Sequence, residues 1–481
     1  MLPMKKFSRF RRALLVNGLL APAMGAVSLG TRAQSAAPVL HGSDLTHAAL
    51  LRDTALAARL PFELMASLVN EVGPRAAGTP GDAKAVQWAV ANLTRLGFSN
   101  VRAEPVPLVA WQRGATSGAV TGTNGRELVV TGLGNTVGTP EAGIEAEVVY
   151  YADFMALRGD TSDRARGRIV FIDEKITRTR DGSGYSRGIL SRISGAVEAS
   201  RRGALAVAIR SLGTDADRIA HTGALRYDPQ VASIPAVAVS VPDADWIAER
   251  AGKGEPLRMR LLMARTSRIQ AMSNNVIAEI PGTDLAGEIV LIGAHLDSWD
   301  ITPGAQDDAA GVGIVTAAAH AILNGKQKPR RTIRVVLFAN EENGFDGAHA
   351  YAARYKDTPH QLVGESDFGA GRIWRIRSRV REAALPAITA MADLLRPLGI
   401  AAEGNEGSAG PDAAVLMRTN NWPAIDLTQD GTNYFDIHHT VADTIDKVNP
   451  GDMAQNAAAW ATVAWIAAQA DVAFGPIAPR R

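Results

Sequence analysis

The chain has 481 residues, of which 46% are hydrophobic and 21% charged, values typical of soluble globular proteins with large cores. Six basic residues and no acidic one lie within residues 1–35, so the formal charge of +2 becomes −4 on the remainder. That mildly acidic remainder gives no electrostatic reason to expect a nucleic acid or an anionic membrane as a partner. The absence of cysteine excludes disulfides, thiolate metal sites and a cysteine nucleophile, so metal ligands must be His, Asp or Glu.

Residues 1–35 have the pattern of an export signal. The basic stretch KKFSRFRR precedes the apolar run ALLVNGLLAPAMGAVSL, and small residues follow. This run is short for a membrane span and contains Asn17 and Pro22, so an uncleaved anchor is the less favoured alternative. Arg11 and Arg12 also fit a twin-arginine signal, which leaves the Sec and twin-arginine routes both open. We therefore expect a periplasmic or extracellular protein with no membrane partner after cleavage.

The next two segments differ in their patterns. Within residues 36–118, apolar residues recur at helical spacing in LTHAALLRDTALAARLPFELMASLVNEVG and DAKAVQWAVANLTRLGF, on either side of the loop GPRAAGTPGD. Residues 119–262 instead contain short β-branched runs, EAEVVYY, GRIVFID, ALAVAIR and IPAVAVS, separated by turn clusters and one expected helix, ILSRISGAVEASRRG. This second segment predicts a β-rich module inserted between two parts of another domain.

Residues 263–481 predict an α/β domain. The apolar runs EIVLIGAH and TIRVVLFAN have the length of strands, and the helical patterns AAGVGIVTAAAHAILNG and FDGAHAYAARY follow them. Strands that are apolar throughout favour a doubly wound, mostly parallel sheet with helices on both faces. A final helix is expected in DMAQNAAAWATVAWIAAQA.

Side chains that bind metals gather where these strands end. The first strand is followed by HLDS and then by GAQDD, the second by NEENG, and ESD and HHTVADT come later. In doubly wound sheets, ligands bind outside the carboxyl ends of the strands. Taken singly, these residues have ordinary explanations as helix caps or solvated charges. As an ordered set of imidazoles and carboxylates, they predict a zinc site.

The motifs HLDSWD, GAQDDAAG, NEENG, ESDFG and HHTVADT, in this order over about residues 270–450, resemble those of the co-catalytic zinc peptidases of clan MH. These are peptidases of the zinc aminopeptidase and glutamate carboxypeptidase type, and the likeness is closest to the carboxypeptidase Q subfamily. The runs GRIVFID, GALAVAIRS, HTGALRYD and IPAVAVS resemble the protease-associated (PA) domain that such enzymes carry as an insert. The resemblance implies a catalytic domain at 36–118 and 263–481, with the PA domain at 119–262.

The resemblance also implies two zinc ions per chain, with His295 and Asp367 at one ion, Glu342 and His439 at the other, and Asp307 bridging both. A cis peptide bond is expected between Asp307 and Asp308. His439 is preferred over the adjacent His438 because it fits the pattern His-Thr-x-x-Asp-Thr.

Further roles follow from the same resemblance. Glu341 is expected to be the general base that deprotonates a water molecule bridging the two zinc ions. Asp297 and Asp443 are expected to support the ligands from behind. His438 and Tyr434 are both candidates for stabilising the oxyanion, because relatives often have a tyrosine at the place that His438 occupies here.

The implied function is that of a secreted metallo-exopeptidase acting on dipeptides or short peptides, and the resemblance leaves open which end of the peptide it trims. Asp412, in SAGPDAAVL, occupies a place near the substrate pocket of relatives, although a helix cap explains it equally well. Two alternatives stay open: a glutaminyl cyclase-like acyltransferase with one zinc, or a non-catalytic receptor or scaffold that binds partners through the PA domain. The relatives also suggest a homodimer.

Overall fold

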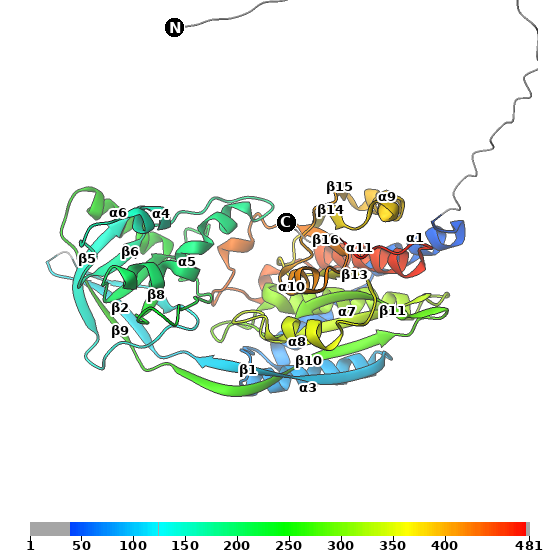
Figure 1. Cartoon of the computed structure of the whole chain (residues 1–481), viewed down its shortest axis with the longest axis horizontal. Coiled ribbons are helices and arrows are strands. Elements are labelled where there is room, and N and C mark those ends of the chain that lie inside the picture. Colours follow the sequence, from blue (N-terminus) through cyan, green and yellow to red (C-terminus); the bar gives the residue numbers. More distant parts are fainter. Residues whose placement is uncertain (1–38, 124, 478–481) are drawn as a thin grey trace, which may run out of the picture. The chain divides into compact units, whose positions relative to one another are not determined.

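The computed structural model describes residues 39–123 and 125–477, so the expected export signal at residues 1–35 lies outside the described residues. The described chain is organised around two eight-stranded sheets (Figure 1). None of the helices in these two ranges is long and apolar enough to cross a lipid bilayer.

The first sheet has a parallel centre and antiparallel edges. Strands β12, β11, β13 and β16 are parallel neighbours, whereas β10 and β1 on one side and β14 on the other pair antiparallel. In sheet order the strands are β1 (Ser99–Gln112), β10 (Ser267–Ile280), β12 (Arg331–Phe338), β11 (Leu285–His295), β13 (His360–Glu365), β16 (Ala424–Gln429), β14 (Ile373–Arg379) and β15 (Ala401–Ala402).

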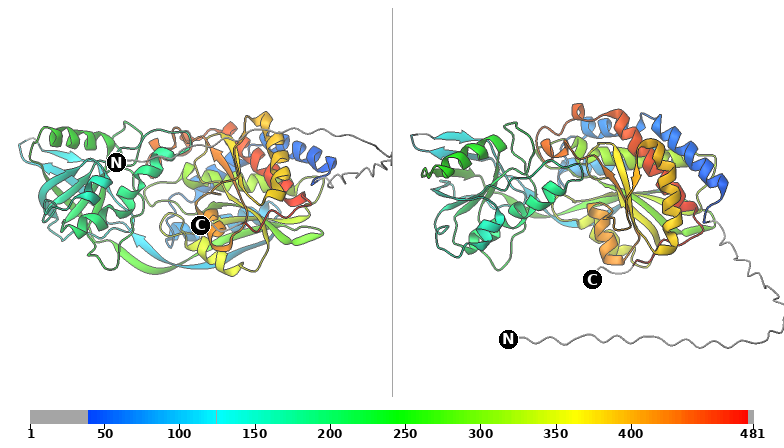
Figure 2. Two further views of the ribbon diagram at one scale, coloured as in Figure 1. Left: turned by 45° about the horizontal axis from the view of Figure 1, so that its top comes forward. Right: turned by 90° about the horizontal axis from the view of Figure 1, so that it is seen from above.

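Helices cover both faces of this sheet, because its central strands bury side chains in both directions (Figure 2). Val290 and Ile292 of β11 join one core, and Ile289 and Leu291 join the other. The first core contains residues of α1 (Gly42–Leu56), α2 (Leu60–Glu71), α3 (Pro80–Arg95), α7 (Ala310–Leu323), α9 (Leu385–Leu395) and α11 (Pro450–Gln469). The second contains residues of α8 (Asp346–Arg354) and α10 (Pro411–Asn420).

The α/β class with helices on both faces is thereby confirmed, but the sheet is mixed rather than mostly parallel. The connection from Ile280 at the end of β10 to Leu285 at the start of β11 is too short for a crossover helix. Strand β11 therefore runs opposite to β10, and the register of β10 against β12 is antiparallel from Val276 to Ile280. This short connection accounts for the antiparallel pairing of β10 with the central strands.

The second sheet lies entirely within residues 116–263, which we call the β-rich module. Its strands, in sheet order, are β3 (Arg126–Leu128), β2 (Thr116–Thr121), β9 (Arg258–Met263), β5 (Ile144–Tyr151), β6 (Ile169–Ile172), β7 (Ala206–Arg210), β8 (Ala236–Val239) and β4 (Val130–Gly132). Apolar side chains fill both faces, where the helices α4 (Phe154–Gly159), α5 (Ser183–Arg201) and α6 (Val241–Gly252) are found. The sequence predicts only α5 of these three helices.

A buried histidine at the start of β13 is held in its neutral form. His360 stacks on Trp422 with ring centres 3.6 Å apart. Its Nδ1 lies 2.8 Å from the carbonyl oxygen of Thr358 and its Nε2 lies 2.9 Å from the Tyr351 hydroxyl. Since Arg334 donates to that hydroxyl, Tyr351 in turn donates to Nε2, and Nδ1 carries the only ring hydrogen. Burial lowers the pKa of His360 to about 3, despite the hydrogen bond to Thr358.

This pKa makes folding stability fall in mild acid. The unfolded chain takes up a proton near pH 6.5 whereas folded His360 does not, so stability is lost as pH falls from 6.5 towards 3. Between pH 6.5 and pH 5, we expect a loss of about 2 kcal/mol in the free energy of unfolding from this residue alone. His360→Phe should be less stable than the wild-type protein at pH 7.5. On acidification to pH 5 its free energy of unfolding should fall by about 2 kcal/mol less than that of the wild type, as measured by urea unfolding at pH 7.5 and pH 5. Equal losses in the two proteins would contradict this assignment.

Candidate metal centre

Four loops bring metal-binding side chains to one edge of the first sheet. Strand β11 ends at His295, β12 is followed by Glu341 and Glu342, and β13 is followed by Asp367. His295 pairs with Phe338 and Gly293 with Glu365 in the parallel register, so these three strands end side by side. The fourth loop follows β16 and carries residues 434–439. The carboxyl ends of the strands thus form the site, as in other open α/β sheets.

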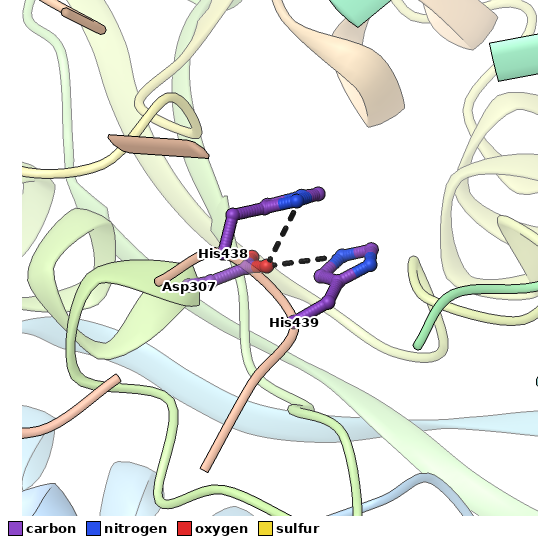
Figure 3. Close-up of side chains that lie close together, drawn as sticks. All are labelled: Asp307, His438 and His439. Carbon is purple, nitrogen blue, oxygen red and sulfur yellow. Dashed lines mark ion pairs between the residues drawn. The ribbon is translucent and has the colours of Figure 1, made fainter. Parts of the chain in front are cut away.

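Asp307 lies at the centre of the site, with one carboxylate oxygen toward each of two groups. Its Oδ1 lies 3.1 Å from His295 Nε2, which is itself 3.6 Å from Asp367 Oδ1. Its Oδ2 lies 3.2 Å from His439 Nε2, which is 3.1 Å from Glu342 Oε2. Figure 3 shows that an oxygen of the Asp307 carboxylate lies next to both His438 and His439, with a dashed line to each ring. The five residues predicted as zinc ligands therefore lie together, with Asp307 in contact with a histidine on either side.

The chemistry of this group fits divalent cations. Asp307 Oδ2 and Glu342 Oε1 are buried and have no hydrogen-bond partner among the described residues. Buried carboxylates without partners are costly unless a cation balances them. Burial alone would lower the pKa of His295, but the carboxylates of Asp367, Asp297 and Asp307 raise it well above its ordinary value. Imidazole nitrogens and carboxylate oxygens in this number suit zinc.

Ligand atoms within 4.8 Å of one another form three groups, and two of these contain a residue outside the predicted ligand set. One group contains His438 together with Asp307 and His439, and another contains Asp308 together with His295 and Asp367. Asp308 instead caps backbone groups: its Oδ1 accepts from Gly311 N at 3.0 Å and its Oδ2 accepts from His295 N at 3.2 Å. The expected cis peptide between Asp307 and Asp308 is present. Asp308 thus provides the helix cap, which leaves Asp307 free for the site.

His438 and His439 stack on each other, with ring centres 3.5 Å apart. His438 Nε2 lies 3.7 Å from Asp307 Oδ2, farther than the 3.2 Å of His439. His439 has the positive φ of 61°, which is uncommon for a residue with a side chain and occurs often at functional sites. This backbone turns its Nε2 toward Asp307 and Glu342 together, whereas His438 approaches Asp307 alone.

Glu341 points into a pocket of about 320 Å³ that also borders Asp307, Glu342, Asp367 and His439. Its backbone N–H donates to Asp297 Oδ1 at 3.1 Å. Burial, followed by the negative charge of Asp367, raises the pKa of Glu341 well above its ordinary value. Cations bound to the neighbouring carboxylates would offset this crowding of negative charge.

The two carboxylates expected behind the ligands act on backbone groups. Asp297 Oδ1 lies 3.6 Å from His295 Nδ1, longer than a hydrogen bond, and binds the Glu341 N–H instead. Asp443 accepts from Gln306 N at 2.7 Å and from Asp307 N at 3.1 Å. Both carboxylates therefore fix loops that carry site residues rather than ligand side chains.

The remaining predicted residues divide between the pocket and the core. Tyr434 and His438 line the pocket. Burial raises the pKa of Tyr434 well above its ordinary value and lowers that of His438. Asp412 is completely buried, and neither of its carboxylate oxygens has a partner among the described residues, although its neighbour Pro411 borders the pocket. Gly410, not Asp412, is the N-cap of α10.

Arg75 is a site residue that the sequence alone does not single out. It comes from the loop GPRAAGTPGD and is fully buried. Its guanidinium donates to the carbonyl oxygens of Leu296 at 2.6 Å and Gly304 at 3.1 Å, and to that of Pro303. These carbonyls belong to the segment between His295 and Asp307, so Arg75 fixes the path of the chain between two site residues.

The β-rich module also reaches the site. The carbonyl oxygen of Thr222 lies 3.3 Å from His439 Nδ1, and Thr222 N donates to the His439 carbonyl at 3.0 Å. His221 Nδ1 lies 2.7 Å from the His438 carbonyl oxygen, and its Nε2 lies 2.8 Å from Asp215. A carbonyl behind a metal-facing imidazole fixes its tautomer and orientation. The module thus orients the loop that carries His438 and His439.

Comparison with known proteins identifies the family of this chain. A model of peptidase family M28 matches residues 275–464. Carboxypeptidase Q of Mus musculus is 33% identical over 412 residues, which cover 85% of this chain and 86% of that protein. The crystal structure of a peptidase M28 precursor from Shewanella amazonensis is 44% identical, with a TM-score of 0.89 over 91% of this chain and 99% of that one.

An aminopeptidase from Aneurinibacillus sp. strain AM-1 shares the fold, with a TM-score of 0.60 at 21% identity over 89% of this chain and the whole of that one. The identity to carboxypeptidase Q over most of both proteins is well beyond a likeness of fold alone. It confirms the resemblance to the zinc peptidases that the strand-end motifs indicate. The chain belongs to peptidase family M28.

Proposed function

We propose that the protein is a zinc-dependent exopeptidase that hydrolyses dipeptides or short peptides at a centre of two zinc ions. The observation that carries the proposal is the position of Asp307, whose two oxygens face two separate groups of His and carboxylate ligand atoms. A pocket large enough for a short peptide opens beside both groups. Relatives named carboxypeptidase Q and zinc aminopeptidase support the reaction class.

His295 and Asp367 would hold one ion, Glu342 and His439 the other, and Asp307 both. Zinc ions bound there supply Lewis acidity, which polarises a peptide carbonyl and makes a water molecule more acidic. Glu341 then accepts the proton of that water at its carboxylate and passes it to the leaving amine. The backbone hydrogen bond to Asp297 keeps Glu341 at the pocket wall while it does so.

Two groups are placed to donate to the oxyanion that develops on the scissile carbonyl. Tyr434 keeps its phenolic hydrogen because its pKa is raised by burial, and His438 stays neutral with one N–H because its pKa is lowered by burial. Both side chains line the same pocket as Glu341. A preformed donor of this kind stabilises the transition state more than the substrate.

We also propose that residues 1–35 direct export and are removed, and that residues 119–262 are a PA domain inserted into the catalytic domain. The basic and apolar pattern of the first segment supports the former. The second sheet, with apolar cores of its own, supports the latter.

Digestion of a peptide library, read by mass spectrometry before and after chelator treatment, tests the function. We expect single residues to be released from short peptides, the activity to disappear with the chelator, and zinc to restore it at about two ions per chain. Activity that survives complete removal of metal would overturn the proposal. One zinc per chain together with cyclisation of amino-terminal glutamine would indicate the cyclase, and a protein without metal or hydrolysis would indicate the scaffold.

A further inference from the structure

Arg192 is a buried cation for which the described part of the chain provides no anionic partner. It lies on α5 of the β-rich module and is 8% exposed, yet it borders the same pocket as Glu341 and Asp307. Within residues 39–123 and 125–477, no carboxylate lies within the 4.0 Å of an ion pair to its guanidinium. Its Nε has no hydrogen-bond partner there either. A buried guanidinium is costly unless an anion accompanies it.

The groups that surround Arg192 in the described part of the chain supply no negative charge to balance it. Its Nη1 lies 3.3 Å from His439 Nδ1, but that nitrogen is also 3.3 Å from the Thr222 carbonyl oxygen. Because His439 Nε2 faces Asp307 and Glu342, a cation at that nitrogen leaves the ring hydrogen on Nδ1, where it is donated to Thr222. The Arg192 N–H then faces another donor. Tyr185 is a neutral neighbour, with the guanidinium carbon 5.5 Å from its ring centre.

Gly223 of the β-rich module leaves space for the guanidinium of Arg192. A Cβ atom on Gly223 would lie 2.1 Å from Arg192 Nη1 and 2.5 Å from its Cζ. Only a glycine therefore lets Arg192 pack against the backbone next to Thr222. The arrangement holds a rigid positive group at the wall of the pocket, one imidazole ring away from the metal-facing nitrogen of His439.

We propose that Arg192 binds the free carboxylate of the residue immediately after the scissile bond. A guanidinium presents paired N–H donors that match a carboxylate, and such bonds are about twice as strong as neutral ones. One residue of extended chain spans roughly 3.5 Å, so a carboxylate held at Arg192 belongs to the residue next to the bond that is cut. The preferred substrates are then dipeptides and peptides that lose a single carboxy-terminal residue. This inference rests on the proposed peptidase function.

The test compares the dipeptide Ala-Leu with its carboxy-terminal amide, Ala-Leu-NH₂. The wild-type protein should cleave the free acid with a kcat/KM at least about 10-fold higher, the effect expected for losing a charge-assisted hydrogen bond. Arg192→Gln should lower kcat/KM for the acid about 10- to 100-fold and leave the amide nearly unchanged, so that the preference disappears. Arg192→Lys should recover part of it, because a point charge replaces the paired donors.

Two further measurements separate substrate binding from a structural role. Free leucine should compete with substrate in the wild-type protein and not in Arg192→Gln, while the zinc content of the two stays equal. Arg187→Gln is the matched control, since Arg187 is exposed on the same helix and does not border the pocket. Equal losses on acid and amide, or loss of zinc from Arg192→Gln, would overturn the inference. A wild-type protein that cleaves neither substrate nor any library peptide would instead overturn the proposed function.

Discussion

Replacing Glu341 with glutamine is expected to lower kcat by about 10²- to 10⁴-fold, the contribution of a general base, with little change in zinc content. The amide cannot accept the proton of the attacking water, yet it keeps the size of the side chain and the backbone hydrogen bond to Asp297. Glu341 lies at the pocket wall and is not within the groups of ligand atoms that surround Asp307. Steady-state kinetics on a dipeptide, with zinc measured in the same samples, checks both halves of the expectation.

The adjacent residue supplies the matched comparison. Glu342 Oε2 lies 3.1 Å from His439 Nε2, so Glu342→Gln should weaken zinc binding and lose activity together with metal. Excess zinc should restore part of the activity of Glu342→Gln, but not the activity of Glu341→Gln. If Glu341→Gln retained full activity, the assignment of the base would be wrong. If both variants lost zinc equally, Glu341 would be a ligand.

The strand-end residues could be predicted because local sequence determines them. A mostly apolar strand that ends at His295, or that is soon followed by Glu341 and Glu342, indicates both the element and its functional end. Asp307 and Asp367 are predicted as ligands through the resemblance to the zinc peptidases, which rests on the order of the motifs. Adjacent His438 and His439 are harder to distinguish, since both reach Asp307 and only the positive φ of His439 turns it toward Glu342 as well.

Other contacts have no local signature. The guanidinium of Arg75 binds backbone carbonyls more than 200 positions away, and any residue type supplies a carbonyl. The same holds for Thr222, which reaches His439 through its main-chain oxygen. The sequence predicts Asp297 and Asp443 as support for the ligands, but not that they bind the N–H groups of Glu341 and Asp307. Backbone partners of this kind become visible only when the fold brings distant segments together.

Replacing Arg75, which lies outside the ligand set, is expected to reduce stability strongly. Arg75→Met keeps much of the side-chain volume but leaves the carbonyls of Leu296 and Pro303 without a donor, and that of Gly304 with the Ala309 N–H alone. At about 1–3 kcal/mol for each of the two carbonyls that lose their donor, we expect the free energy of unfolding to fall by at least about 2 kcal/mol. Urea unfolding of the zinc-loaded protein measures this loss. Arg95→Gln, at an exposed position near the end of α3, is the control.

The same replacement should weaken zinc binding, because the segment from Leu296 to Gly304 leads directly into the loop that carries Asp307. Once its carbonyls are released, this segment can move, and Asp307 is no longer held between His295 and His439. Arg75→Lys should be intermediate, since one ammonium group cannot reach three carbonyls in the fixed directions that a guanidinium provides. Competition with a zinc-binding dye gives the affinity of each variant. Unchanged affinity in a destabilised Arg75→Met would show that Arg75 supports the fold without positioning the bridging carboxylate.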